Sequence, residues 1–266
     1  FLISNLNAET IFFDSKNIKI ENDGNLIYAT DGLAKIPNQN VTIEGKKSIY
    51  NKFISELTVI GNVKFFDNLN NVYIESEKAI YNEIDNTILT SGKTFIKLED
   101  KYKINSKNVL FDRNTKKISS KLDTTAFDNK ENIYNFSEGF LFDTTLEVIS
   151  SKVSAIIDSE LNNYFFENSK INLKKNEIVG KEIKINFRDS FFGDKNNDPI
   201  LKGRSTISND QKTTIQKTVF STCNIENKKC RGWELQSEEF SHNKIKKLFE
   251  YRNSWLKVFD QKVFFL

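Results

Sequence analysis

Proline is almost absent from this chain, whose 266 residues contain only Pro37 and Pro199. Because proline cannot donate a hydrogen bond to a β-ladder, its scarcity permits long uninterrupted strands. Cysteine and histidine are equally rare, with Cys223, Cys230 and the single His242. These residues are too few to suggest a metal centre, because zinc sites usually combine two closely spaced ligand pairs.

Long apolar runs and blocks of one charge are also missing. No stretch approaches the roughly 18 consecutive apolar residues of a membrane helix. The 39 basic and 36 acidic residues leave a net charge of +3, and no Lys/Arg block stands out, so the sequence predicts no nucleic-acid surface. The 23 Phe and 8 Tyr residues argue against disorder, and the length permits a sizeable core.

Catalytic motifs find no support either. His242 lies in FSHNKIKK, without a nucleophile elbow or a phosphate-binding glycine loop nearby. The carboxylates are scattered over turns and polar strand positions, which is typical of solvated surface charge. The sequence therefore predicts a protein that is not an enzyme and has no cofactor or metal.

What the chain does contain is period-2 alternation of apolar and polar residues, as in 62–66, 71–76, 101–106, 170–175 and 181–187. Such alternation predicts half-buried β-strands. Short clusters of Asn, Asp, Lys and Gly separate these segments and predict turns. Helix signals are nearly absent, so we expect an all-β fold.

A repeat underlies this alternation. Residues 41–63 align with residues 72–94 at an offset of 31, which places Gly61 on Gly92, and a third copy at 102–120 follows at an offset of 30. Each copy predicts strand, turn, strand and turn. A unit of this size cannot close its own core, so we expect neighbouring copies to stack. The repeat register is unclear between residues 122 and 160.

Fifteen apolar positions recur on one face of these repeats. They can form the core of an ordinary β-sandwich or β-solenoid, or an apolar groove that holds acyl chains, because both look alike in sequence. These lipid-groove candidates are Val41, Ile43, Tyr50, Leu57, Val59, Val63, Phe65, Val72, Ile74, Tyr81, Ile88, Ile96, Ile104, Phe111 and Ile118.

The two cysteines enclose six residues in CNIENKKC. This spacing disfavours zinc and a thioredoxin-like pair, which needs two intervening residues. It fits a local disulfide between Cys223 and Cys230 in an oxidising compartment, which is the prediction here, and the alternative is two free thiols in a reducing compartment.

The C-terminal segment 221–266, STCNIENKKCRGWELQSEEFSHNKIKKLFEYRNSWLKVFDQKVFFL, resembles the end of the periplasmic domain in the lipopolysaccharide-assembly outer-membrane protein family (LptD, or OstA, family). The corresponding positions are Thr222, Cys223, Cys230, Trp233, His242, Asn243, Tyr251, Asn253, Val263, Phe264, Phe265 and Leu266. The upstream Ser/Gly-centred repeats resemble the fold that this family shares with its soluble bridge relatives, LptA and LptC. Two features depart from the family pattern: Asn243 replaces an aspartate, and Gln261-Lys262 stands where a proline is expected.

The resemblance implies an elongated, V-shaped β-jelly-roll of two facing antiparallel sheets. Residues 1–220 would form the jelly-roll, and residues 221–266 a Cys/Trp junction, with Trp233 packed beneath it, leading toward an outer-membrane barrel absent from this chain. The family uses its cysteines in disulfides, so Cys223 and Cys230 are expected to pair with each other or with cysteines outside the chain.

The implied function is lipopolysaccharide transport at the periplasmic face of the Gram-negative outer membrane, with acyl chains in the apolar groove. Implied partners are lipopolysaccharide, an LptA-like bridge protein joined by edge-strand pairing, and an LptE-like lipoprotein through the missing barrel. Two alternatives stay open: a soluble LptA/LptC-like bridge, and a structural or adhesive surface β-solenoid without lipid.

Overall fold

The structure is a computed structural model that describes residues 11–187, 199–222, 232–246 and 248–266. The described residues form twenty strands and one short 3₁₀ helix, η1 (Pro37–Gln39), and the strand pairings between neighbours are antiparallel. The predicted all-β fold is confirmed. No helix in the described ranges is long and apolar enough to cross a membrane.

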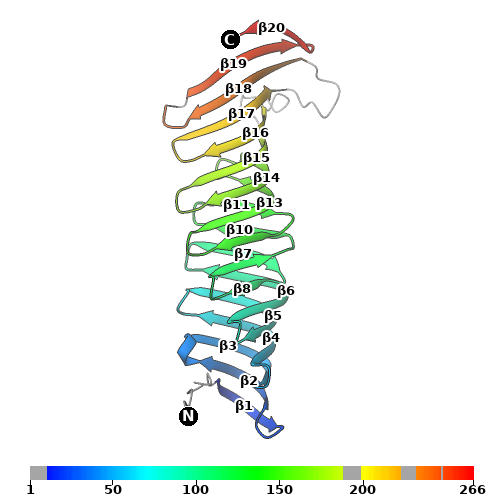
Figure 1. Cartoon of the computed structure of the whole chain (residues 1–266), viewed down its shortest axis with the longest axis vertical. Helices are drawn as coiled ribbons and strands as arrows, with labels where there is room; N and C mark the ends of the chain where they lie inside the picture. The colour runs from blue at the N-terminus through cyan, green and yellow to red at the C-terminus, as the bar shows by residue number, and fades with distance from the viewer. Residues whose placement is uncertain (1–10, 188–198, 223–231, 247) are drawn as a thin grey trace, which may run out of the picture. The chain divides into compact units, whose positions relative to one another are not determined.

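The chain divides into two compact units, unit 1 (Phe1–Asn129) and unit 2 (Lys130–Leu266). The predicted boundary at residues 220 and 221 lies within unit 2, where β17 (Lys212–Ser221) and β18 (Trp233–Asn243) pair with each other. Figure 1 labels the strands of both units.

Unit 1 is a meander in which each of the first six strands pairs with the next. Its strands are β1 (Phe12–Glu21), β2 (Leu26–Ile36), β3 (Val41–Asn51), β4 (Glu56–Asp67), β5 (Val72–Asn82), β6 (Thr87–Leu98), β7 (Tyr102–Lys107), β8 (Leu110–Asp112), β9 (Lys117–Ser120) and β10 (Thr124–Asp128). β6 pairs with both β7 and β8, so these two short strands act as the halves of one longer strand. β9 and β10 are related in the same way, because β9 pairs with β8 and β10 pairs with β7.

Each long strand of unit 1 changes direction near its middle. In β4 and β6 the change occurs at Gly61 and Gly92, which have φ of 83° and 81°, values that favour glycine. The pairing of β3, β4 and β5 also shifts register near these positions. The repeat predicted from sequence is therefore confirmed, because Gly61 and Gly92 occupy the same bend in successive hairpins.

The bends divide each strand between two walls that face one another. Phe65, from the second half of β4, meets Phe111 of β8 edge-to-face, with ring centroids 6.5 Å apart. Buried residues alternate with more exposed ones along both halves of each strand, as expected when one face of each wall packs on the other. Unit 1 thus encloses an apolar interior between its walls.

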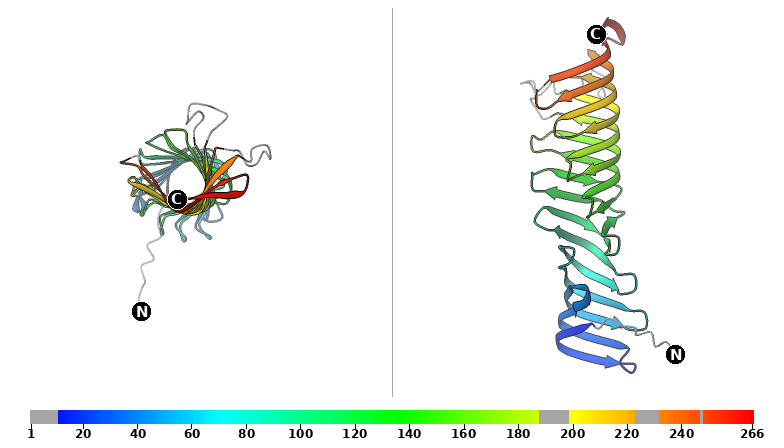
Figure 2. Two further views of the ribbon diagram at one scale, coloured as in Figure 1. Left: turned by 90° about the horizontal axis from the view of Figure 1, so that it is seen from above. Right: turned by 60° about the vertical axis from the view of Figure 1, so that its left-hand side comes forward.

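Unit 2 repeats this arrangement with strands that stack in chain order (Figure 2). They are β11 (Ile133–Phe136), β12 (Phe140–Asp143), β13 (Val148–Ile157), β14 (Asn163–Asn172), β15 (Glu177–Asn186), β16 (Ile200–Ser208), β17 (Lys212–Ser221), β18 (Trp233–Asn243), β19 (Leu248–Val258) and β20 (Gln261–Phe265). Here the left-handed residues within the strands include Asn168, Glu182, Lys217 and Asn253. The interior of unit 2 is also apolar, with Phe136, Phe142, Leu201 and Ile215 almost fully buried.

The strand ends of each unit form two rims. In unit 1, rim A contains the turns at 37–40, 68–71 and 99–101, and rim B contains the turns at 52–55, 83–86 and 113–116. In unit 2, rim A contains the turns at 129–132 and 158–162, and rim B those at 173–176, 209–211 and 244–246. Backbone hydrogen bonds link successive turns along a rim, for example from Glu83 N to Ser55 O and from Lys244 N to Gln211 O.

Candidate functional site

All fifteen lipid-groove candidates lie in unit 1, on β3 to β9, and point into the interior between the walls. Their exposed fractions run from 0% to 6%, with Tyr50 the most exposed. The structure therefore brings the predicted residues together on one continuous apolar surface. Whether that surface holds side chains alone or also an acyl chain stays a prediction.

Several interior residues of unit 1 were missed in the sequence. Ala29, Ala34 and Ala79 are buried to 2% exposure or less, as are Ile36 and Val109. The alanines carry a weak hydrophobic signal, and the alternation around them does not distinguish inner from outer positions. Val109 stands between β7 and β8, where the strand pattern is interrupted.

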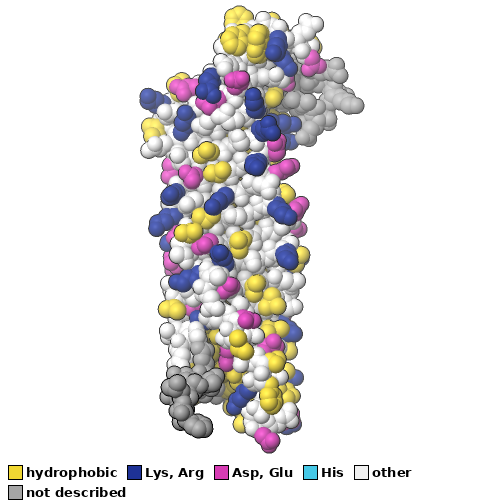
Figure 3. Space-filling view, viewed as in Figure 1, with side chains coloured by type: hydrophobic (Ala, Val, Ile, Leu, Met, Phe, Trp, Pro, Cys, Tyr) yellow, Lys and Arg dark blue, Asp and Glu magenta, His cyan; other side chains and the backbone are white. Residues whose placement is uncertain are grey.

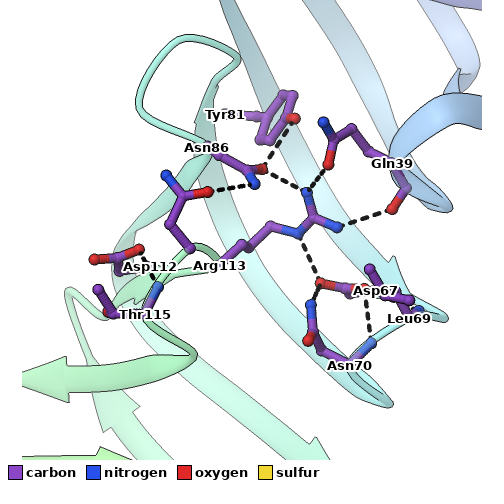
Figure 4. A network of polar contacts seen from close by, with 10 residues as sticks. Gln39, Asp67, Leu69, Asn70, Tyr81, Asn86, Asp112, Arg113 and Thr115 are labelled. Carbon is purple, nitrogen blue, oxygen red and sulfur yellow. Dashed lines mark hydrogen bonds and ion pairs between the residues drawn. The ribbon is translucent and has the colours of Figure 1, made fainter.

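Arg113, in a rim B turn, was not singled out in the sequence although it makes the most extensive polar contacts of unit 1 (Figure 4). Its Nε donates to Asp67 Oδ2 at 2.7 Å. Its other guanidinium nitrogens donate to Gln39 Oε1 at 3.0 Å, Gln39 O at 2.8 Å and Asn86 Oδ1 at 2.5 Å. Asp67 also accepts from the backbone N–H groups of Leu69 and Asn70, each at 3.0 Å.

These contacts join the two rims of unit 1. Asp67 ends β4 at rim A, whereas Asn86 follows β5 at rim B. An 11-residue strand such as β5 would hold these rims about 33 Å apart if it were straight. A single arginine reaches both rims. The strands must therefore fold back at their bends, so that the two rims come close together. We call the line along which Arg113 joins the rims the seam of unit 1.

The seam is shielded from water. The side chains of Arg113 and Asp67 are 1% and 0% exposed. Burying such a pair costs desolvation energy, which the planar arginine offsets through several well-aligned hydrogen bonds. Removing one partner would leave the other charge buried and uncompensated, so the seam depends on both.

A groove of about 1150 Å³ runs along the opposite side of unit 1, where the strands bend. It is lined by Asp31, Gly32, Leu33, Glu44, Gly45, Lys46, Gly61, Asn62, Val63, Lys64, Glu75, Ser76, Glu77, Lys93, Thr94, Phe95, Asn105, Ser106, Lys107 and Asp123. Of the fifteen predicted residues, only Val63 lines it. We call this feature the bend groove.

The bend groove combines charged groups with buried hydroxyls. Thr94 Oγ1 lies 2.7 Å from Thr90 Oγ1, and Ser106 Oγ lies 2.7 Å from Thr124 Oγ1, so these buried hydroxyls bond one another. The charged lining residues carry both signs, and Figure 3 likewise shows basic and acidic side chains interspersed on the face it displays. The groove therefore offers ammonium groups without forming a strongly cationic surface.

The β1 end of unit 1 leaves apolar surface uncovered. β1 pairs with β2, and no other described strand of unit 1 pairs with β1. Ile18 lies opposite Ala29, an interior residue, yet it is 48% exposed, and Ile20 on the same face is 62% exposed. The described residues therefore leave open both the outer edge of β1 and this end of the apolar interior.

The predicted Cys223–Cys230 disulfide lies outside the described residues. Trp233, expected to pack beneath it, is 36% exposed and lies 5.9 Å from the ring of Phe220. His242 is half-buried on β18, with its ring 4.6 Å from that of Phe249. Within the described ranges, no three His, Cys, Asp or Glu side chains gather in a way that could hold a metal ion.

No protein-family model matches the chain, and no curated protein matches it significantly.

Proposed function

We propose that unit 1 carries the acyl chains of lipopolysaccharide between its walls and belongs to a lipopolysaccharide-transport protein of the LptD type at the periplasmic face of the outer membrane. The observation that supports this proposal most is the continuous apolar interior of unit 1, whose β1 end no described residue covers. The resemblance of residues 221–266 to the LptD family supports it independently.

The physical argument rests on the cost of exposing acyl chains to water. Each buried CH₂ contributes about 0.8 kcal/mol, so a chain of about twelve carbons gains roughly 10 kcal/mol from an apolar interior. The fifteen inward residues supply such a surface. The chain would enter by displacing contacts between the walls, while phosphates stay in water within reach of Lys46, Lys64, Lys93 and Lys107 in the bend groove.

The outer edge of β1, which no described strand of unit 1 pairs with, accounts for how the cargo would arrive. A bridge protein of the LptA type could add its last strand to β1 by β-augmentation. The added strand would cover Ile18 and Ile20 and extend the apolar interior into the bridge. A soluble bridge protein with the same fold remains the nearest alternative identity for this chain.

A structural β-solenoid without lipid is the second candidate function. The observation that favours it is the burial of all fifteen inward residues, because side chains alone already fill their surroundings. The two candidates differ in whether the walls separate to admit a chain.

Photo-crosslinking from paired positions distinguishes lipopolysaccharide transport from a structural role without lipid. Three adjacent pairs each contain one inward and one outward residue: Phe65 and Phe66, Ile74 and Tyr73, and Phe111 and Leu110. A photoreactive phenylalanine at the inward member should capture lipopolysaccharide in living cells, and the outward member should capture little. Absence of lipopolysaccharide at all three inward positions in folded protein would remove the transport proposal and favour the structural one.

A further inference from the structure

The rims of unit 2 also meet, but different groups join them. Lys130, in a rim A turn, donates from Nζ to Asn176 Oδ1 of rim B at 2.8 Å, in an exposed position. Farther along, the carboxylates of the 158–162 turn in rim A act electrostatically on groups at the rim B end of β18. Asp158 acts on Lys244, and Glu160 acts on His242. We call this line, from Lys130 to Lys244, the seam of unit 2.

The hydrogen bonds of these charged groups stay within their own rims. Asp158 accepts from Tyr164 Oη at 2.9 Å and from Asn162 Nδ2 at 3.0 Å, both in or next to its own turn. Lys244 Nζ donates to Ser208 Oγ at 3.2 Å and to Asn209 O at 2.5 Å. Among the described residues, no hydrogen bond or ion pair joins Asp158 or Glu160 to His242 or Lys244.

Behind this seam lies a cluster of aromatic rings. Phe240 lies 5.5 Å from Phe249 and 5.2 Å from Tyr251, measured between ring centroids, and Phe249 in turn contacts His242. Phe240 is buried, whereas Phe249 is 43% exposed. The apolar interior of unit 2 is thus separated from the seam by half-buried side chains rather than by a buried ion pair.

We propose that unit 2 opens laterally along its seam, between the 158–162 turn and the end of β18, and gives an apolar chain access to Phe240, Phe249 and Tyr251. The seam of unit 1 stays closed, because opening it would break the three hydrogen bonds by which Arg113 holds Asp67 and Gln39 of rim A. Opening unit 2 breaks the exposed hydrogen bond from Lys130 to Asn176 and separates charges that no hydrogen bond or ion pair joins among the described residues, which costs much less. This inference goes beyond the proposed function and does not depend on the cargo of unit 1.

Matched spin-label pairs in the full chain test the proposal. One pair spans the seam of unit 2, at Leu161 and Ile245, and the other spans the seam of unit 1, at Leu69 and Thr115. Leu161, Ile245 and Leu69 are 67%, 73% and 65% exposed, so labels there should not disturb the interior. Attaching the labels to genetically encoded p-acetylphenylalanine leaves Cys223 and Cys230 untouched.

Pulsed electron–electron double resonance should give a narrow distance distribution for the unit 1 pair and a broad or two-peaked distribution for the unit 2 pair. Dodecyl maltoside, kept below its micelle concentration as an apolar-chain probe, should shift only the unit 2 pair toward longer distances. Equally narrow distance distributions in both units would overturn lateral opening. A unit 2 distance distribution that does not change when dodecyl maltoside is added would overturn access by an apolar chain.

The reciprocal variant is Arg113→Gln, which should broaden the unit 1 distribution. If this protein folds poorly, Gln39→Ala removes the hydrogen bond from Arg113 to Gln39 Oε1, keeps the bond to the Gln39 backbone carbonyl, and should produce a smaller broadening. A unit 1 pair that stays narrow in both variants, with native circular dichroism, would show that Arg113 does not hold the seam closed and would overturn the contrast on which the proposal rests.

Discussion

In unit 1 the two rims meet through an arginine and an aspartate from which water is excluded, whereas in unit 2 they meet through an exposed lysine–asparagine bond and a group of separated charges. Both units enclose an apolar interior between bent strands, so the wall architecture alone does not determine how firmly the interior is closed. Opening the seam of unit 1 breaks the three hydrogen bonds from Arg113 to Asp67 and Gln39 together. The exposed bond from Lys130 to Asn176 contributes much less to closure.

The largest expected difference between the seams is their sensitivity to loss of one partner. Arg113→Met should lower the free energy of opening unit 1 by about 3–5 kcal/mol, because it leaves Asp67 buried and unpaired. Lys130→Met should lower that of unit 2 by less than about 1 kcal/mol. Hydrogen exchange of peptides from each unit in the full chain measures both.

The double variant Arg113→Met/Asp67→Leu is the control for this prediction, because it removes both charges and should recover much of the lost stability. Equal effects of Arg113→Met and Lys130→Met would show that the buried pair contributes no more than the exposed bond, and the contrast between the seams would have to be abandoned.

The bends of the two units should also respond differently to added side chains. In unit 2, a Cβ on Gly203 would lie 2.1 Å from Ile215 Cγ2, although φ there is unexceptional. Gly203→Ala should therefore cost about 1–3 kcal/mol through overpacking of the buried Ile215. In unit 1, a Cβ on Gly92 meets nothing within 4 Å, but φ is 81°. Gly92→Ala should cost about 1–2 kcal/mol through backbone strain.

Asparagine variants distinguish overpacking from backbone strain, because asparagine tolerates left-handed φ better than other residues with a Cβ. Gly92→Asn should recover part of the stability lost in Gly92→Ala, whereas Gly203→Asn should be at least as damaging as Gly203→Ala. Denaturant unfolding followed by circular dichroism measures all four variants. Similar results for asparagine and alanine at Gly92 would argue against backbone strain there.

Period-2 alternation was sufficient to predict the strands, because every wall has one apolar face and one polar face. The fifteen inward residues follow from the same pattern, and the 31-residue offset correctly aligned Gly61 with Gly92. The two walls form because the strands bend. Most bends lie at residues whose type does not predict a bend. Glu182 and Lys217 adopt left-handed φ within their strands, yet neither residue type favours that conformation.

Long-range polar contacts were beyond sequence analysis for a different reason. Arg113 and Asp67 are 46 positions apart, and only the return of the strands at the bends brings them together. The unclear register between residues 122 and 160 also has a structural cause. β10, β11 and β12 contain five, four and four residues, too few for alternation to fix the register.

The smallest expected difference between the seams is their response to pH. Burial lowers the pKa of His242, and Lys244 at the end of the same strand adds to this effect, while Glu160 across the seam opposes it. Phe249 from β19 and Thr213 from β17 also face this ring without contributing charge. The closed seam therefore favours neutral His242, whereas an open seam should return its pKa toward the ordinary value of about 6.5.

The sign of the effect follows from proton binding. As the pH falls below about 6.5, the open form takes up a proton before the closed form does, so closure loses stability on acidification and is unaffected well above that value. Between pH 7.5 and 5.5, the long-distance population of the Leu161/Ile245 label pair should rise, and His242→Gln should abolish the rise. Unit 1 contains no histidine, so the Leu69/Thr115 pair should not change. A response that persists in His242→Gln would show that His242 is not the source of the pH sensitivity.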